Sequence, residues 1–275
     1  MEELNEAEIL KKIEENPKDP DALYNLGLIR FRQGRQGDAE TLWTTALGYA
    51  PTHYKSLFGI GYIRYSQKLW QEAADYFTKA VSAKPDSFQA HCNLGMALHK
   101  LGQLKEAEAS LREALRLNPK DGISLSSLAK VLEDMDRYPE AESLIREALR
   151  LQPDSADYLY DLGVCLYNHG RYKESEGVFR RIREIDPQYQ NASVMLQMIL
   201  LDLARYAKGE KLYRKEVRKN PDDPEARYGL AFELRSLGKY EKARAEIMKA
   251  VELFQNNGNR EGVERSMKLL EGIGG

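Results

Sequence analysis

A proline recurs every 34 residues through most of this 275-residue chain, and that regular step limits the fold more than any other feature. The prolines on the step are Pro17, Pro51, Pro85, Pro119, Pro153, Pro187 and Pro221. A small residue keeps the same step at Ala39, Ala73, Ala107, Ala141, Ser175, Gly209 and Ala243. A fixed period of this length indicates copies of one supersecondary unit. The sequence therefore predicts a repeat architecture, although length alone would suggest roughly two ordinary domains.

Each unit is predicted to form two helices. Apolar residues recur at helical spacing on both sides of Gly102, first as Leu94, Leu98 and Leu101 and then as Ala107, Leu111 and Ala114. Glycine suits the left-handed turn that follows a helix, and the proline on the step ends the second helix because it lacks a donor. One helix pair cannot bury its apolar stripe alone, so stacked copies should form an all-α solenoid.

Further features of the repeat point to a family. They are a Leu–Gly pair such as Leu94–Gly95, the alanines Ala107 and Ala114, and the closing proline. A ring column adds Tyr138, Tyr172, Tyr206 and Tyr240. Together with the 34-residue step, these features resemble the tetratricopeptide repeat (TPR) family. The resemblance implies a right-handed superhelical solenoid of helix-turn-helix repeats, in which first helices line a concave face and second helices lie outside.

The resemblance covers residues 20–257 as seven ungapped repeats: 20–53, 54–87, 88–121, 122–155, 156–189, 190–223 and 224–257. Residues 1–19 and 258–275 are predicted to be the N-terminal and C-terminal capping helices, because a terminal repeat would otherwise expose apolar surface. We expect the apolar faces of these caps to consist of Ala7, Leu10 and Ile13 at the N-terminus and Val263, Met267 and Leu270 at the C-terminus.

The residue types that usually carry chemistry form no catalytic pattern. The four histidines show no zinc-binding spacing, and Cys92 and Cys165 are far apart without a CxxC motif. No glycine-rich stretch fits a phosphate-binding loop. We therefore expect a protein that is not an enzyme and that has no catalytic residue, metal site, cofactor or small-molecule substrate.

Charge and apolar content argue against other classes. The formal net charge is −2, so the chain lacks the positive charge of a general nucleic-acid binder. The first residues are acidic, which argues against a signal peptide, and the longest apolar stretch is far shorter than the ~18 residues of a membrane span. Two cysteines are too few for a disulfide framework. A cytoplasmic protein without nucleic-acid partners is the expectation.

The resemblance also indicates which side chains of the first helices face the concave groove. These candidate partner-binding residues are Tyr24, Asn25, Leu28, Phe31, Lys55, Phe58, Tyr62, Tyr65, Asn93, Met96, Lys100, Tyr160, Asp161, Tyr167, Met195, Met198 and Tyr228. Many of them are aromatic or Met side chains, which offer protein partners a large and adaptable contact area. Some of the rings could instead pack between neighbouring repeats, and the sequence leaves both readings open.

Two peptide-binding modes of the family can be compared with these columns. A carboxylate clamp places Lys in the first inward column and Asn in the second, where they hold a C-terminal carboxylate. Here the first column contains neither Lys nor Arg and the second contains no Asn, so the clamp is not expected. An asparagine ladder grips a peptide backbone through amide donors and acceptors. Only Asn25 and Asn93 match its column, which leaves binding of an extended peptide open.

Charge on the predicted concave face is uneven. Repeats one to three carry Arg32, Lys55 and Lys100 against Asp21, whereas repeats four to seven carry Lys130 and Arg235 against Glu133, Asp134, Asp157, Asp161, Asp202 and Glu225. This difference predicts a ligand with the opposite polarity along its length.

Repeat six departs most from the family pattern. Gln197 replaces a small residue, and an apolar inner face is formed by Val194, Met195, Met198 and Leu201. This repeat could be a degenerate copy with relaxed packing. It could also form a hydrophobic pocket for a partner's anchor residue, or a patch for self-association.

The sequence thus predicts a non-catalytic scaffold that holds a peptide or a partner surface in its concave aromatic and Met-lined groove. Two other roles stay open. The chain could be a homo-oligomer that holds another copy in the same groove, or an accessory subunit that presents a substrate to a catalytic partner. A helical-repeat RNA reader is a weaker alternative, because the acidic columns would repel RNA.

Overall fold

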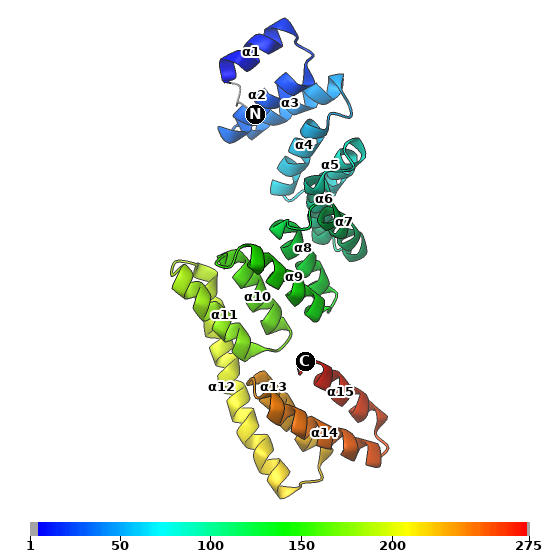
Figure 1. The fold of residues 1–275 in the computed structure, drawn as a ribbon, viewed down its shortest axis with the longest axis vertical. Coiled ribbons are helices and arrows are strands. Elements are labelled where there is room, and N and C mark those ends of the chain that lie inside the picture. The colour runs from blue at the N-terminus through cyan, green and yellow to red at the C-terminus, as the bar shows by residue number, and fades with distance from the viewer. Residues whose placement is uncertain (1–4, 274–275) are drawn as a thin grey trace. The chain divides into compact units, whose positions relative to one another are not determined.

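A computed structural model describes residues 5–273, which fold into fifteen helices packed in sequence as a TPR-like solenoid (Figure 1). The chain divides into two compact units, Met1–Arg137 and Tyr138–Gly275, and each is described by itself. Among the helices of the described residues, none is both long and apolar enough to cross a bilayer.

The first unit contains one leading helix and then alternating first and second helices of the repeats. Its helices are α1 (Glu6–Glu15), α2 (Pro20–Arg32), α3 (Gln36–Tyr49), α4 (Tyr54–Ser66), α5 (Trp70–Ala83), α6 (Phe88–Lys100), α7 (Leu104–Leu117) and α8 (Gly122–Asp134). The pairs α2–α3, α4–α5 and α6–α7 are in close contact. Several first helices begin at a polar cap: the side chains of Asp19, Ser87 and Asp121 accept backbone N–H groups of the first turn.

The small residues of the repeat allow the helices of a pair to approach closely. Ala73 and Ala107 are completely buried. At Gly61, an added Cβ would lie 2.8 Å from the ring of Phe77, and at Gly163 it would lie 2.6 Å from the ring of Phe179. A larger residue would therefore force the two helices apart.

The second unit begins with the second helix of repeat four. Its helices are α9 (Tyr138–Leu151), α10 (Ala156–Asn168), α11 (Tyr172–Ile185), α12 (Gln190–Lys219), α13 (Pro224–Ser236), α14 (Tyr240–Asn256) and α15 (Arg260–Glu271). The expectation of two helices in every repeat is wrong for repeat six, because α12 is one continuous helix of 30 residues.

The turn position of repeat six explains the continuous helix. In the other repeats, one turn residue has a left-handed backbone with φ between 59° and 78°: Gly34, Lys68, Gly102, Asp136, Gly170 and Gly238. Repeat six has Ala204 at this step. A left-handed conformation costs about 1–2 kcal/mol for a residue with a Cβ, and Ala is the best helix former. The helix therefore continues through Ala204.

Gln197 is a second reason why repeat six forms one continuous helix instead of a helix pair. It stands at the column of Gly61 and Gly163, where the ring of the second helix leaves no room even for a Cβ. At the column of Phe77 and Phe179, repeat six has Tyr213. A helix pair in repeat six would press Tyr213 onto the Gln197 side chain, so this repeat is disfavoured as a hairpin.

The first and last helices pack against α2 and α14, but their inward residues differ from those expected. In α1, Ile9 is buried at 2% exposure while Leu10 is 41% exposed and Ala7 is exposed. One residue along a helix is a rotation of about 100°, which turns Leu10 away from α2. In α15, Leu269 is buried and Met267 is exposed, whereas Val263 and Leu270 pack against the core as expected.

Candidate protein-binding site

The predicted groove rings of the first unit are half-buried, with one side packed on the second helices. The Tyr24 ring stacks on Trp43 at 5.7 Å between centroids, and Phe58 lies 5.6 Å from Phe77. Both rings keep part of their surface accessible. The second helices therefore fix the orientation of these two rings, each of which packs on a ring of its own repeat and keeps part of its surface accessible.

The next two columns of the first unit behave in the same way. Leu28, Phe31, Tyr65 and Met96 are half-buried, and Tyr62 is 47% exposed. Phe31 meets the Tyr62 ring edge-on at 5.9 Å. These columns present a continuous set of partly exposed apolar side chains on α2, α4 and α6, a surface suited to a protein partner.

One of the predicted groove cations is already paired. Lys55 Nζ donates to Asp21 Oδ1 at 2.6 Å and lies 5.8 Å from the centroid of the Tyr24 ring. The hydrogen bond from Lys55 lowers the pKa of Asp21. Lys100 is exposed at the end of α6. Asp21 is already counted against these cations, so this pair leaves the expected excess of positive charge unchanged.

The two amides that match the asparagine column are not equivalent. Asn25 is half-buried on α2. Asn93 uses its Nδ2 to donate to the backbone oxygen of Gln89 at 2.8 Å, within its own helix. A peptide would have to displace that bond to use both ends of the Asn93 amide.

In the second unit, one of the predicted groove tyrosines is hydrogen-bonded to an acidic side chain. The Tyr167 hydroxyl donates to Asp202 at 2.7 Å, which raises the pKa of Tyr167 to about 12. Tyr160 is half-buried and meets the Phe179 ring edge-on at 5.6 Å. Asp161 is only 8% exposed, so it offers a partner little surface.

The inner face of α12 is partly exposed and partly packed. Met195 is half-buried against the core cluster that contains Phe179 and Leu196. Met198 is 45% exposed and Leu201 is 67% exposed. A hollow of about 310 Å³ beside them is lined by Arg183, Ser193, Leu196, Gln197, Leu200 and Leu201. Repeat six thus presents an open apolar strip beside a shallow hollow.

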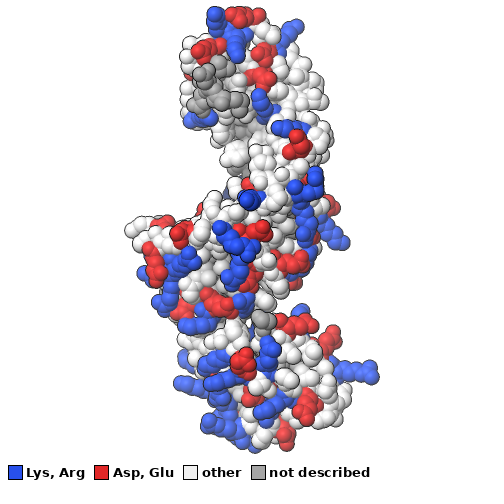
Figure 2. Space-filling view, in the orientation of Figure 1, with Lys and Arg blue, Asp and Glu red and all other residues white. Residues whose placement is uncertain are grey.

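The C-terminal half of α12 is basic. Its exposed cations are Arg205, Lys208, Lys211, Lys215, Arg218 and Lys219. Figure 2 shows Lys and Arg gathered over this part of the second unit. Arg214 and Lys219 pair with Glu210 and Glu216. The face has the character of a solvated helix surface.

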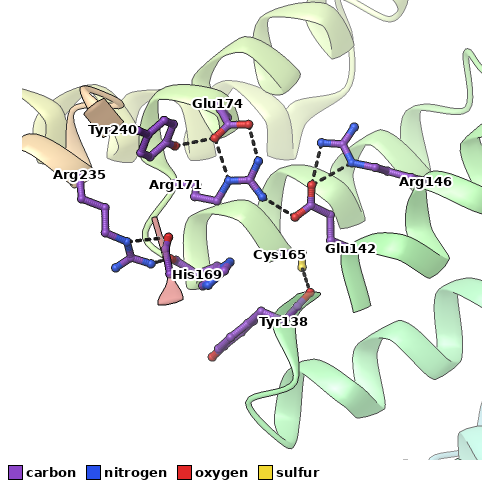
Figure 3. Close-up of polar contacts among 10 residues, drawn as sticks. Tyr138, Glu142, Arg146, Cys165, His169, Arg171, Glu174, Arg235 and Tyr240 are labelled. Carbon is purple, nitrogen blue, oxygen red and sulfur yellow. Dashed lines mark hydrogen bonds and ion pairs between the residues drawn. The ribbon is translucent and has the colours of Figure 1, made fainter. Parts of the chain in front are cut away.

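Repeat seven contacts repeat five directly in the second unit (Figure 3). Arg235 Nη2 donates to the backbone oxygen of His169 at 2.5 Å, and the Tyr240 hydroxyl donates to Glu174 Oε1 at 2.5 Å. Each pair is separated by 66 residues. Burial and the bond to Glu174 raise the pKa of Tyr240 to about 12. These hydrogen bonds hold the turn between α13 and α14 against the turn between α10 and α11.

The same network ties two second helices together. Arg171 forms ion pairs with both Glu142 and Glu174, and Arg146 reaches Glu142 at 2.7 Å. Burial by itself would raise the pKa of Glu174. The hydrogen bonds from Arg171 and Tyr240 outweigh this effect, so the pKa of Glu174 is lowered. The charges here are paired internally, which favours a structural role.

A hollow of about 570 Å³ lies on repeat seven, between α12, α13 and α15. Rings and carboxylates line it: Tyr213, Tyr228, Phe232, Glu216, Asp223, Glu225 and Glu233, with Ala226, Gly229 and Arg265. The guanidinium of Arg265 lies 4.6 Å from the Tyr228 ring centroid and pairs with Glu225. Among the candidates from the sequence, only Tyr228 belongs to this hollow.

Sequence reasoning missed Glu233 and Arg265, which line this hollow, and it treated Gly209 beside them only as a member of the small-residue column. The available signal was a comparison of every 34-residue column, because Glu233 stands where the other repeats have apolar residues.

Within the described part of the chain, no group of three or more His, Cys, Asp or Glu side chains could hold a metal ion.

Comparisons with solved structures agree on the fold. A tetratricopeptide repeat protein from Parabacteroides merdae is 18% identical, with a TM-score of 0.60 over 92% of this chain and 98% of that one. YrrB is 24% identical, with a TM-score of 0.57 over 67% and 95% of the two chains. TTC0263 from Thermus thermophilus is 22% identical, with a TM-score of 0.55 over 66% and 99%. No curated protein matches the sequence.

Two family models match the sequence itself. The tetratricopeptide repeat model matches residues 224–257, which are the seventh repeat of the sequence analysis. The model described as the cilia and flagella-associated protein 70 C-terminal domain matches residues 2–229, well over half of the chain. TPR domains are generally protein-interaction modules and are typically non-catalytic. This chain belongs to the family of the cilia and flagella-associated protein 70 C-terminal domain, and it is built from TPR repeats.

Proposed function

We propose that this protein is a non-catalytic scaffold that binds a peptide or a partner surface on the inward side of its first helices. The observation that carries the proposal is the half-burial of the rings there. Tyr24 and Phe58 rest on Trp43 and Phe77 and still expose part of their surface. Rings held in place before binding lose little conformational entropy when a partner covers them.

The proposal includes the way in which the partner is held. The first inward column has no Lys or Arg, and Lys55 beside it is paired with Asp21 at 2.6 Å. A partner's C-terminal carboxylate would therefore find no clamp of free cations. Apolar and aromatic anchors of the partner are the groups that these columns fit.

The family suggests where the partner acts. Because the matching family is named for a cilium- and flagellum-associated protein, we propose an association with that organelle. YrrB is described as a TPR protein with an unusual peptide-binding site, and peptide binding is part of the present proposal as well. Imaging of the tagged protein in ciliated cells tests the location, and exclusion from cilia would contradict it.

The binding surface is tested by a matched pair of tyrosines. Tyr62 on the first helix α4 is 47% exposed, and Tyr49 at the end of the second helix α3 is 49% exposed. Affinity capture from the native cell should recover the same partners with the wild type and Tyr49→Ala and lose them with Tyr62→Ala. Equal recovery with both variants, each checked for unchanged helicity, would contradict the proposed surface.

A second candidate is self-association through α12, favoured by the exposed apolar strip that contains Val194, Met198 and Leu201. Light scattering coupled to size-exclusion chromatography distinguishes the two roles. A dimer that becomes a monomer in Met198→Ser/Leu201→Ser supports self-association. A monomer at all concentrations excludes it and leaves the partner-binding role unaffected.

A further inference from the structure

Glu233 stands in a column that is otherwise apolar. The other residues of this column are Ile29, Ile63, Ala97, Val131, Cys165 and Ile199. From Ile63 to Ile199, each of these side chains is at most 1% exposed. Repeat seven therefore places a carboxylate at a position where the repeat normally buries a hydrocarbon side chain. A carboxylate at such a position loses hydration unless a partner replaces the lost contacts.

A second departure from the pattern makes room for this carboxylate. Gly209 on α12 occupies the column in which other repeats have Ala or Ser. A Cβ at Gly209 would lie 2.4 Å from Glu233 Oε1, so any other residue at this position would displace the carboxylate. The glycine at position 209 therefore makes room for the Glu233 carboxylate. The two residues that depart from the repeat pattern lie against each other between α12 and α13.

The Glu233 carboxylate is incompletely satisfied. Its Oε2 is buried and has no hydrogen-bond partner among the described residues. Burial raises the pKa of Glu233, and the nearby charge of Arg205 offsets this only in part. A buried oxygen without a donor is destabilising, typically by about 1–3 kcal/mol. A cation in the adjoining hollow would stabilise the charge of this carboxylate.

The hollow around Glu233 has the chemistry of a cation site. Tyr213, Tyr228 and Phe232 line it with rings, and a cation over such a ring gains electrostatic attraction. Arg265 shows this directly, since its guanidinium lies over the Tyr228 ring at 4.6 Å and pairs with Glu225. Arg265 forms its ion pair with Glu225, whereas the Oε2 atom of Glu233 has no hydrogen-bond donor among the described residues.

We propose that this hollow binds a cationic side chain of a partner protein, with Glu233 as the counter-ion. The inference rests on the proposed partner-binding function and names one group that the partner supplies. The chemistry is shared by a lysine ammonium, a methylated ammonium and an arginine guanidinium, all of which combine positive charge with an affinity for aromatic faces.

The experiment uses the full chain, ¹⁵N-labelled, and follows its amide resonances by NMR. The probes are the Nα-acetyl amides of lysine, trimethyl-lysine, arginine and norleucine. We expect saturable shifts at Gly229, Phe232 and Glu233 with the cationic probes and none with norleucine, which has a similar chain without charge. The ranking of the three cations identifies the source of the charge.

Four variants, one of them a control, distinguish a ligand-binding site from a purely structural feature. Glu233→Gln should weaken binding of the lysine probe at least tenfold. Gly209→Ala should weaken it as well without changing any charge, because the added Cβ displaces the Glu233 carboxylate. Glu241→Gln, on the exposed surface of α14, is the matched control and should bind as the wild type does. Glu233→Val restores the apolar column, so it should abolish binding while raising the unfolding temperature.

The outcomes keep this inference separate from the proposed function. Equal shifts with norleucine, absent shifts with every cation, or full binding by Glu233→Gln would each overturn the cation site. If those results appeared while Tyr62→Ala still lost the captured partners, the scaffold role would stand without it. If the cationic probes bound as expected while Tyr62→Ala lost nothing, the site would stand and the ring surface would fail.

Discussion

The continuous helix α12 depends on Ala204, and replacing this residue with glycine should break it. In a helix interior, glycine is about 1 kcal/mol less favourable than alanine. In the left-handed turn, glycine avoids a penalty of about 1–2 kcal/mol that alanine would incur. Both effects favour the turn, and together they shift the equilibrium by about 2 kcal/mol, roughly thirtyfold.

Spin labels at Ser193 and Lys215 report the difference directly, because both residues are exposed on α12. Along a continuous helix, 22 residues span about 33 Å at 1.5 Å per residue. In a helix pair, the same two positions would face one another across an interaxial distance of about 10 Å. Cys92 and Cys165 are buried cysteines and are replaced before labelling.

The same chain offers a control for the folded-back geometry. His91 and Glu113 occupy the equivalent positions in repeat three, where α6 and α7 form a pair. The charge of His91 contributes to the lowered pKa of Glu113, so the two side chains are close. Labels at this pair should give a short distance in every variant.

We expect a single long distance in the wild type and a short component in Ala204→Gly. That component should grow when Gln197→Gly is added, because a glycine at 197 makes room for the Tyr213 ring. A short distance in the wild type would refute the continuous helix. An unchanged long distance in the double variant would refute the reasoning from the turn and the small-residue column.

Three further predictions test the electrostatics. Reversing Lys55 and Lys100 to Glu should weaken partner binding and change its salt dependence; affinities that stay equal across salt concentrations would remove the proposed charge polarity. Tyr240→Phe removes the donor to Glu174 and should lower the free energy of unfolding by about 1 kcal/mol in urea titrations, whereas Tyr49→Phe should leave it unchanged. The folded-state pKa of Glu233 is raised, so the folded protein binds more protons than the unfolded one above the ordinary value of 4.5. The stability of the wild type relative to Glu233→Val should therefore fall as the pH rises through this region, and a pH-independent difference between their unfolding temperatures would contradict the shift.

The helix pairs could be predicted from the sequence because the period is carried by side chains that act locally. Gly102 allows a left-handed turn, and Pro119 follows the end of the second helix. The fusion in repeat six follows from the same chemistry, since Ala204 lacks what Gly102 supplies. It is visible only when the turn position is compared in every repeat, because one alanine in an alternating pattern is otherwise unremarkable.

The exposure of the predicted groove residues was harder to predict, because it depends on how each first helix packs against its second helix. Tyr24 and Phe58 were placed on the inward face, but their half-burial is set by Trp43 and Phe77 on the adjacent helices. Asp161 shares the same face in sequence and is nevertheless buried. The hollow around Glu233 could not be predicted from one repeat, because it arises from residues of two successive repeats.

The continuous helix α12 and the proposed cation site depend on each other through Gly209. In repeat five, the equivalent Ser175 donates its hydroxyl to the backbone of Gly163, within its own repeat. In repeat six, Gly209 instead faces Glu233 of the next repeat. Folding α12 back would turn Gly209 toward Gln197 and remove the room for the carboxylate. The variant Ala204→Gly/Gln197→Gly should therefore lose binding of the lysine probe in proportion to its short-distance population. Full binding by a folded-back population would show that the cation site does not require the continuous helix.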